Sequence, residues 1–304
     1  MILLLEQLLN GLQYGVMLFL MAAGLTLVFG IMGLINLAHG SLYMIGAYAA
    51  AWTQQQTGSF LLGLAAGLAA AGVLGVALEM AILRRLYGRA HLDQVLATFG
   101  VILFANEAVA MLFGRQPLMA GLPRWLAGAV EIVPGVPYPL YRLAIIAVGL
   151  AVAAGLYGLI AHTRIGMLVR AGATHRALVG ALGVRIGLLF TAVFGLGALL
   201  AGLAGALTGP LLSVQVGMGE RILIATFVVI VIGGLGSVRG ALAGSVLVGM
   251  VDTLARAYLP GALRGVMAAA DADALGAGLS SMAIFILMAA VLLWRPRGLF
   301  PTHG

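Results

Sequence analysis

Residues 8–30 read LLNGLQYGVMLFLMAAGLTLVFG, an apolar run of 23 residues without a charged side chain. A helix needs about 20 mostly apolar residues to cross the ~30 Å hydrocarbon core of a bilayer, so this stretch predicts a membrane-spanning helix. The further apolar segments are residues 39–52, 61–83, 95–113, 143–161, 187–207, 222–232, 240–258 and 279–294. The chain is therefore predicted to be an all-α, polytopic membrane helix bundle with about 8–10 spans.

The composition excludes several classes of protein. Hydrophobic residues make up 63% of the 304 residues and charged residues only 8%, too few for the surface of a water-soluble domain. Cysteine is absent, which excludes disulfides and thiol chemistry, and all 16 basic residues are arginine. Without lysine the chain cannot carry the Walker A loop of a P-loop ATPase. We find no catalytic or metal-binding spacing and predict no enzyme activity and no cofactor in this chain.

The net charge of +7 is explained by basic loops between membrane spans rather than by nucleic-acid binding. The basic stretches are residues 84–89, 162–185 and 295–297. Placing them on the inner side leaves ten arginines inside and six outside, counting Arg239 as inside. This arrangement predicts an outer N-terminus, a cytoplasmic C-terminus and an outer position for residues 115–142.

Two glycine-containing breaks interrupt the apolar sequence, at residues 33–41 and 233–240. The second follows a segment of only eleven residues, about 16 Å of helix. Such breaks in both halves of a chain point to discontinuous or re-entrant helices around a transport path, with tight surface turns as the alternative. Residues 36–42 can be aligned with 236–242, which indicates a short internal duplication. We expect one transmembrane domain over residues 1–304.

Polar residues within the apolar segments are candidates for a translocation path. Buried polar groups are costly in a membrane and usually face the interior of a bundle, where they either line a path or bond neighbouring helices. The candidate path residues are Asn36, His39, Ser41, Asn106 and Ser237. Glu79 precedes Arg84 near a predicted inner end and is expected to form a surface ion pair with it.

The basic loop at residues 162–186 predicts a short amphipathic helix. Thr174 is expected to cap this helix, and Gly183 to end it in the left-handed conformation. Its apolar face would consist of Leu178, Val179 and Leu182, with Arg176 off that face. Such a helix could dock in a groove of a partner protein or lie on anionic membrane lipid, and the spacing leaves both open.

Four stretches, in order, resemble the membrane subunits of bacterial ABC importers for branched-chain amino acids, of the LivH type (LivH/LivM family). The first is GLTLVFG at residues 24–30, which runs into GLINLAHG at 33–40 and YMIGAY at 43–48. The others are TRIG at 163–166 with Arg170 and LGV at 182–184, GGLGS at 233–237, and RPRGLF at 295–300. Together they cover nearly the whole chain.

This resemblance implies a permease subunit in the bacterial inner membrane that carries branched-chain amino acids into the cytoplasm. It also implies four kinds of partner: a second, LivM-like permease, two ABC ATPase subunits that bind ATP and Mg, a periplasmic solute-binding protein, and membrane lipid. The residues it assigns to ATPase coupling are Arg170, Thr174, Arg176, Leu178, Val179, Leu182 and Gly183. The loop departs from the family in lacking an acidic residue near Thr174 and in having Val179 where alanine is common. Importers of urea or short-chain amides look similar, and an ion-coupled secondary transporter is a further alternative.

Overall fold

The computed structural model describes residues 2–34, 36–133, 135–174 and 176–300, with only the backbone at 133, 173–174 and 176–178. The helices are α1 (Ile2–Met32), α2 (His39–Thr57), α3 (Phe60–Ala81), α4 (His91–Phe113), α5 (Leu140–His162), α6 (Arg164–Thr174), α7 (Arg176–Ala181), α8 (Ile186–Thr208), α9 (Met218–Gly233), α10 (Val238–Leu263) and α11 (Ala269–Trp294). Two short 3₁₀ helices, η1 (Leu83–Arg85) and η2 (Arg124–Leu126), lie between them.

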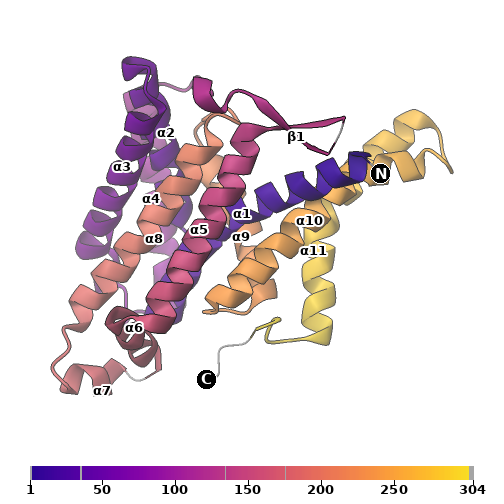
Figure 1. Cartoon of the computed structure of the whole chain (residues 1–304). Helices are drawn as coiled ribbons and strands as arrows, with labels where there is room; N and C mark the ends of the chain where they lie inside the picture. The colour runs from indigo at the N-terminus through magenta and orange to yellow at the C-terminus, as the bar shows by residue number, and fades with distance from the viewer. Residues whose placement is uncertain (1, 35, 134, 175, 301–304) are drawn as a thin grey trace.

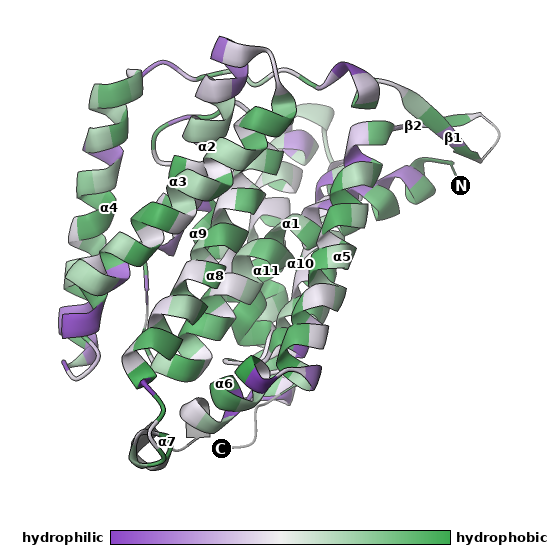
Figure 2. Cartoon of the chain, turned by 60° about the vertical axis from the view of Figure 1, so that its left-hand side comes forward, coloured by the Kyte–Doolittle hydropathy of each residue, from purple (hydrophilic) through white to green (hydrophobic). Residues whose placement is uncertain are grey.

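The predicted helical membrane bundle is confirmed, and each of the nine predicted apolar segments is a helix. Within the described residues seven helices are long and apolar enough to cross a bilayer: α1, α3, α4, α5, α8, α10 and α11. The other two are α9, whose 16 residues span about 24 Å, and α2, which ends in the polar run Gln54-Gln55-Gln56. Figure 2 shows hydrophobic residues along most of each helix and hydrophilic residues mainly toward the two ends of the bundle.

Two elements were not predicted from the sequence. The antiparallel strands β1 (Ala129–Val133) and β2 (Val136–Pro139) form a hairpin in the segment expected to lie outside the membrane. Helix α6 precedes the short helix expected in the basic loop. The hairpin lies at one end of the bundle and α6 and α7 at the other (Figure 1).

Helix α1 lies at the centre of the fold and packs against α5, α8, α9 and α10. Its glycines permit close approach: Gly15 lies against the backbone of Ser245 in α10, and Gly24 against Gly197 in α8. A Cβ atom at either glycine would come within 3 Å of a backbone oxygen of the neighbouring helix. Close packing of small residues is a main source of helix association in membranes, which explains part of the high glycine content.

The first predicted break folds back into the bundle. Gly33, with a φ of 62°, ends α1, and the following chain is buried at Leu34, Asn36 and Ala38. Helix α2 then begins at His39, which lies beside Gly24 of α1 and so near the middle of α8. Helix α2 is therefore discontinuous with α1, as the break predicts.

The second predicted break is a tight turn. Residues 234–237 join α9 to α10, and the Ser237 amide donates to the Gly234 carbonyl at 3.1 Å. The other internal break lies instead at residues 209–217, which lead into α9. Gly219 in the first turn of α9 lies against Gly40 in the first turn of α2, where a Cβ atom on either would meet the backbone of the other.

The break after α1 and the break at residues 209–217 after α8 give the fold an internal repeat. In each half, a long helix (α1 or α8) is followed by a break, a helix that begins deep in the bundle (α2 or α9), and a third helix (α3 or α10). Contacts are exchanged between the halves, since α3 packs on α8, α10 on α1, and α2 on α9. The alignment of residues 36–42 with 236–242 is therefore wrong. It rested on shared glycines, whereas Gly40 is matched in space by Gly219.

Candidate functional site

A cavity of about 1180 Å³ lies between α1, the end of α5 with α6, and the start of α10. It exceeds the range of about 300–1000 Å³ that is typical of small-molecule pockets. Helix α1 contributes Phe19, Thr26, Leu27, Phe29, Gly30 and Ile31. Helices α5 and α6 contribute Leu150, Ala153, Ala154, Tyr157, Ile160, Ala161, Val169 and Arg170, and the α9–α10 turn with α10 contributes Leu235, Gly236, Ser237, Val238, Arg239 and Leu242.

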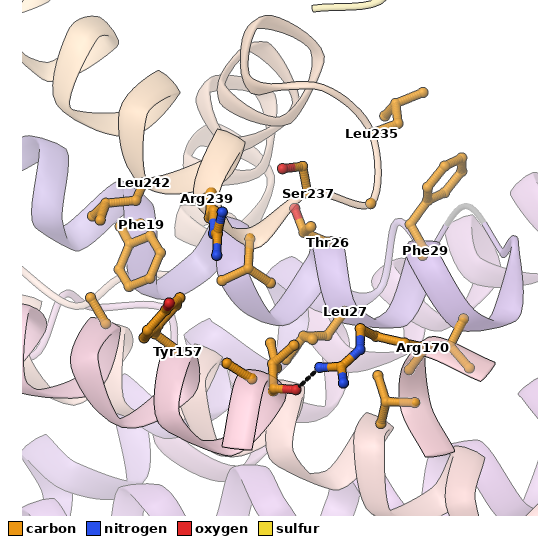
Figure 3. Close-up of a pocket in the computed structure, with 18 of the residues that line it drawn as sticks. Phe19, Thr26, Leu27, Phe29, Tyr157, Arg170, Leu235, Ser237, Arg239 and Leu242 are labelled. Atoms are coloured by element: carbon orange, nitrogen blue, oxygen red, sulfur yellow. Dashed lines mark hydrogen bonds between the residues drawn. The ribbon is translucent and has the colours of Figure 1, made fainter. Parts of the chain in front are cut away.

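The start of α10 contributes two polar side chains to the cavity, Ser237 and Arg239. The Ser237 side chain caps this helix by accepting from the Gly240 amide at 3.0 Å. The Arg239 guanidinium extends toward α5 and lies 5.3 Å from the centre of the Tyr157 ring, a cation–π contact across the cavity (Figure 3).

Thr26 is the polar residue that α1 contributes to the cavity wall, close to Ser237 (Figure 3). Its side chain is 0% exposed, and its hydroxyl has no hydrogen-bond partner within the described part of the chain. Most buried hydroxyls in proteins are paired, so this group is an exception that needs an explanation.

Helix α6 joins the predicted coupling segment to the cavity. Arg170 lines the cavity and donates from Nη1 to the carbonyl oxygen of Ile160 at the end of α5 (Figure 3). Gly166 lies directly against the same carbonyl, so α6 is held closely on the end of α5. A displacement of α6 would therefore move a wall of the cavity.

The five predicted path residues do not meet in one place. Ser237 lines the cavity. Asn36, His39 and Ser41 are buried around the α1–α2 break, where the Asn36 side chain accepts from the Ala38 amide at 3.1 Å. Asn106 lies on α4, and its role in a path stays a prediction, as do those of the three residues at the break.

Asn106 pairs with a carboxylate that the sequence analysis did not single out. Its Nδ2 donates to Oε1 of Glu220, in the first turn of α9, at 2.5 Å. Glu220 Oε2 and Asn106 Oδ1 are both buried and have no partner among the described residues. The pair bonds α4 to the discontinuous helix α9.

The coupling residues lie on α6, α7 and the turn that follows. Thr174 is the last residue of α6, and Arg176 and Leu178 belong to α7, but their side chains lie outside the described residues. Gly183 has a φ of 85°, which confirms its left-handed conformation. The predicted apolar face is divided, since Val179 is 4% exposed and Leu182 is 77% exposed. Helix α7 ends at Ala181, so Leu182 leaves the helical register and projects outward.

The predicted ion pair between Glu79 and Arg84 is present, but the Glu79 carboxylate is buried and does not lie at the surface. It is 0% exposed and accepts bonds from Arg84 at 3.1 Å, Tyr87 at 2.6 Å and Thr191 at 2.8 Å. These residues bring α3 and its following turn onto the beginning of α8. The uncharged residues 80–83 between Glu79 and Arg84 do not indicate which way the carboxylate faces, so the sequence could not predict its contact with the neighbouring helix.

The described residues contain no cluster of three or more histidine, aspartate or glutamate side chains able to hold a metal ion. The chemistry that the cavity offers is thus binding through apolar walls, the guanidinium groups of Arg170 and Arg239, hydroxyl groups and a helix amino end.

Comparisons with known proteins agree on one family. The family model described as the permease component of branched-chain amino acid transport systems matches residues 7–292. The high-affinity branched-chain amino acid transport system permease protein BraD of Pseudomonas aeruginosa is 30% identical over 97% of this chain and 95% of its own. LivH of Escherichia coli K12, of the same description, is 28% identical over 97% and 94% of the two chains. The probable LivH permease of Methanocaldococcus jannaschii is 26% identical over 94% and 89%. No solved structure matches the chain.

Proposed function

Since the chain belongs to the family of branched-chain amino acid transport permeases, a family of multi-pass membrane proteins whose role is transport, we propose that it is the membrane-spanning subunit of an ABC importer. Its solutes are branched-chain, apolar amino acids, which it passes into the cytoplasm. ATP is bound and hydrolysed, with Mg, by two partner ATPases. A second related permease and a periplasmic binding protein complete the assembly.

The observation that carries the proposal is the cavity beside the central helix. Its walls are mostly aliphatic, and α6 forms part of one wall through Val169 and Arg170. Leucine, isoleucine and valine have small branched side chains that suit such a surface, because apolar burial is favourable and non-directional.

The segment α6–α7 is proposed as the coupling element to the ATPases. It lies at the same end of the bundle as the end of α11 (Figure 1), and Leu182 is exposed. When ATP closes the ATPase pair, α7 would move with its groove and carry α6, and with it the cavity wall. We place this end in the cytoplasm, following the arginine-rich loops, and the chain in the bacterial inner membrane.

The test is uptake by proteoliposomes that contain this chain with its partner subunits. We expect uphill transport of leucine that needs ATP and the binding protein, and none with an ion gradient alone. Transport of urea or acetamide in preference to leucine would favour the amide-importer alternative. Uphill transport by the isolated chain on a proton or sodium gradient would contradict the proposal, since it would make the chain a secondary transporter.

A further inference from the structure

Two helix ends of opposite polarity meet at one end of the cavity. Helix α10 begins there at Val238, and α1 ends there at Met32, with Gly30 of α1 close against Gly236. The amino end of a helix carries partial positive charge and the carboxyl end partial negative charge. We propose that this end of the cavity is a zwitterion site: Ser237 and Arg239 bind the α-carboxylate of an amino acid, and the ammonium group faces the last turn of α1. The inference rests on the proposed function and names the chemical feature of the solute that this chain recognises.

The start of α10 is suited to a carboxylate. The Ser237 hydroxyl accepts a hydrogen bond from the Gly240 amide at 3.0 Å, and the Ser237 carbonyl accepts one from the Ala241 amide at 2.8 Å. The amides of Val238 and Arg239 have no acceptor among the described residues. Amides of a first helical turn beside a guanidinium form an oxyanion site, because each supplies a donor and the helix dipole adds to the positive field.

Arg239 supplies the positive charge at the start of α10. It forms no ion pair with any described carboxylate, and its contact with Tyr157 holds the guanidinium over the cavity. No aspartate or glutamate lines the cavity, so the site carries net positive charge. A neutral amide or urea gains little from that charge, whereas an amino acid presents one full negative charge to it.

Thr26 is the independent observation that points to a ligand. Its buried hydroxyl is unpaired and lies next to Ser237 in the cavity wall (Figure 3). An unpaired buried hydroxyl destabilises the fold, which a bound oxyanion would relieve by accepting its hydrogen bond. Thr26 has no accessible surface in this state, so its contact with a ligand requires a local rearrangement of the cavity wall.

The remaining walls suit the rest of the solute. Leu27, Leu150 and Leu242 form aliphatic surface near these polar groups. A leucine molecule can therefore place its carboxylate on α10, its ammonium group near the carbonyl end of α1 and its side chain on this surface.

The test measures binding of small ligands to the full-length chain in nanodiscs of zwitterionic phosphatidylcholine, by saturation-transfer NMR. We expect L-leucine to bind at least about tenfold more tightly than leucinamide, which has the same side chain and amine but no carboxylate. Arg239→Gln should weaken leucine about tenfold or more and leave leucinamide unchanged. Thr26→Val should weaken leucine by several-fold without lowering the melting temperature, because no internal hydrogen bond is lost.

Arg124→Gln is the matched control, because Arg124 lies in η2 just before the hairpin and does not line the cavity, and this variant should bind leucine as the wild type does. Equal binding of leucine and leucinamide, or an Arg239→Gln protein that binds leucine normally, would overturn the site. The same oxyanion chemistry occurs in lipid headgroups. The site would also be overturned if the chain retained phosphatidylglycerol in an Arg239-dependent manner and bound no leucine in nanodiscs of phosphatidylcholine or of phosphatidylglycerol.

Failure of the site and failure of the proposed function are distinguishable. If the reassembled complex imports leucine on ATP while Arg239→Gln binds and transports normally, the site is wrong and the function stands. If the complex does not import leucine while the chain binds isovalerate in an Arg239-dependent manner, the proposed solute is wrong and the oxyanion site stands.

Discussion

Glu79 is the residue with the densest set of buried polar contacts in the described part of the chain. Its carboxylate accepts hydrogen bonds from Arg84, Tyr87 and Thr191. Arg84 also donates to the Thr191 hydroxyl at 2.7 Å. A buried carboxylate is tolerated in a membrane bundle only when its charge is paired and its oxygens are hydrogen-bonded. The cluster therefore fixes the start of α8 to the end of α3.

We expect Glu79→Ala to lower the melting temperature of the purified protein by about 5 °C or more, because it leaves several donors without an acceptor. Thermal unfolding in detergent, followed by size-exclusion fluorescence, measures this. Glu107→Ala is the matched control, since Glu107 also pairs with an arginine, Arg115 at 2.9 Å, but both side chains are exposed. Exposed pairs contribute little, so the control should melt near the wild type. Equal losses in the two variants would refute the structural role of Glu79.

Single polar residues show the limit of sequence reasoning at this scale. Apolar flanks place Glu79, Thr26 and Asn106 within membrane segments, but they do not say which neighbour each side chain meets. All three face other helices whose positions follow from packing far along the chain. Arg239 could be recognised only as an inner-side charge, because its contact with Tyr157 depends on α5 lying opposite α10.

The crossing of α2 and α9 is the main constraint at the scale of elements. Gly40 and Gly219 bring the first turns of the two helices together. The backbone of each helix occupies the space that a side chain at the other glycine would need. Two helices that begin inside the bundle need this contact, because their ends would otherwise be separated by side chains in the hydrocarbon layer.

Gly219→Ala should strongly reduce the yield of folded protein, since the added methyl group meets the Gly40 backbone. Gly100→Ala is the matched control in α4, where a Cβ atom meets nothing within 4 Å. That change should leave the yield intact or raise stability by about 1 kcal/mol at most. Membrane-extracted, monodisperse protein measured for both variants decides the matter, and a normal yield of Gly219→Ala would be inconsistent with the crossing.

The α6–α7 segment permits a separate prediction about coupling. Leu182→Asp should reduce ATP-driven uptake by the complex at least about tenfold, because a charge would enter the apolar groove that we propose receives this residue. Folding should be unaffected, since Leu182 is exposed. Leu212→Asp is the control, an exposed leucine in the α8–α9 connection. Uptake by Leu182→Asp at the wild-type rate would exclude coupling through this residue.

The helices were predictable from hydropathy because apolar length alone identifies a membrane segment. The breaks were harder, since glycines at 233–236 and at 209–219 give similar signals while one stretch is a tight turn and the other leads into the bundle. The segment 129–139 has only nine strand residues and contains three prolines, Pro134, Pro137 and Pro139, so the alternation of its side chains could not be distinguished from a loop.

The two ends of the whole molecule differ in their elements. One end carries the hairpin and the start of α1, and the other carries α6, α7 and the end of α11 (Figure 1). The proposed topology, which follows the arginine-rich loops, has the second end in the cytoplasm.

The orientation can be tested directly because the chain has no native cysteine. Glu131→Cys in the hairpin should react with a membrane-impermeant maleimide in intact spheroplasts. Leu182→Cys should react only after the membrane is permeabilised. Labelling of both from the same side would contradict the proposed topology, and the unsubstituted protein gives the background.

The central position of α1 has a consequence for biogenesis. Its main partner, α10, begins at Val238, about 200 residues after α1 ends at Met32. At ribosomal rates of about 5–20 residues per second, α1 waits roughly 10–40 s in the bilayer before that partner is synthesised. During this interval the surface of α1 that α10 later covers, which includes Gly15, faces lipid, the translocon or a chaperone. Nascent chains truncated before α10 should therefore be preferred substrates for membrane proteases.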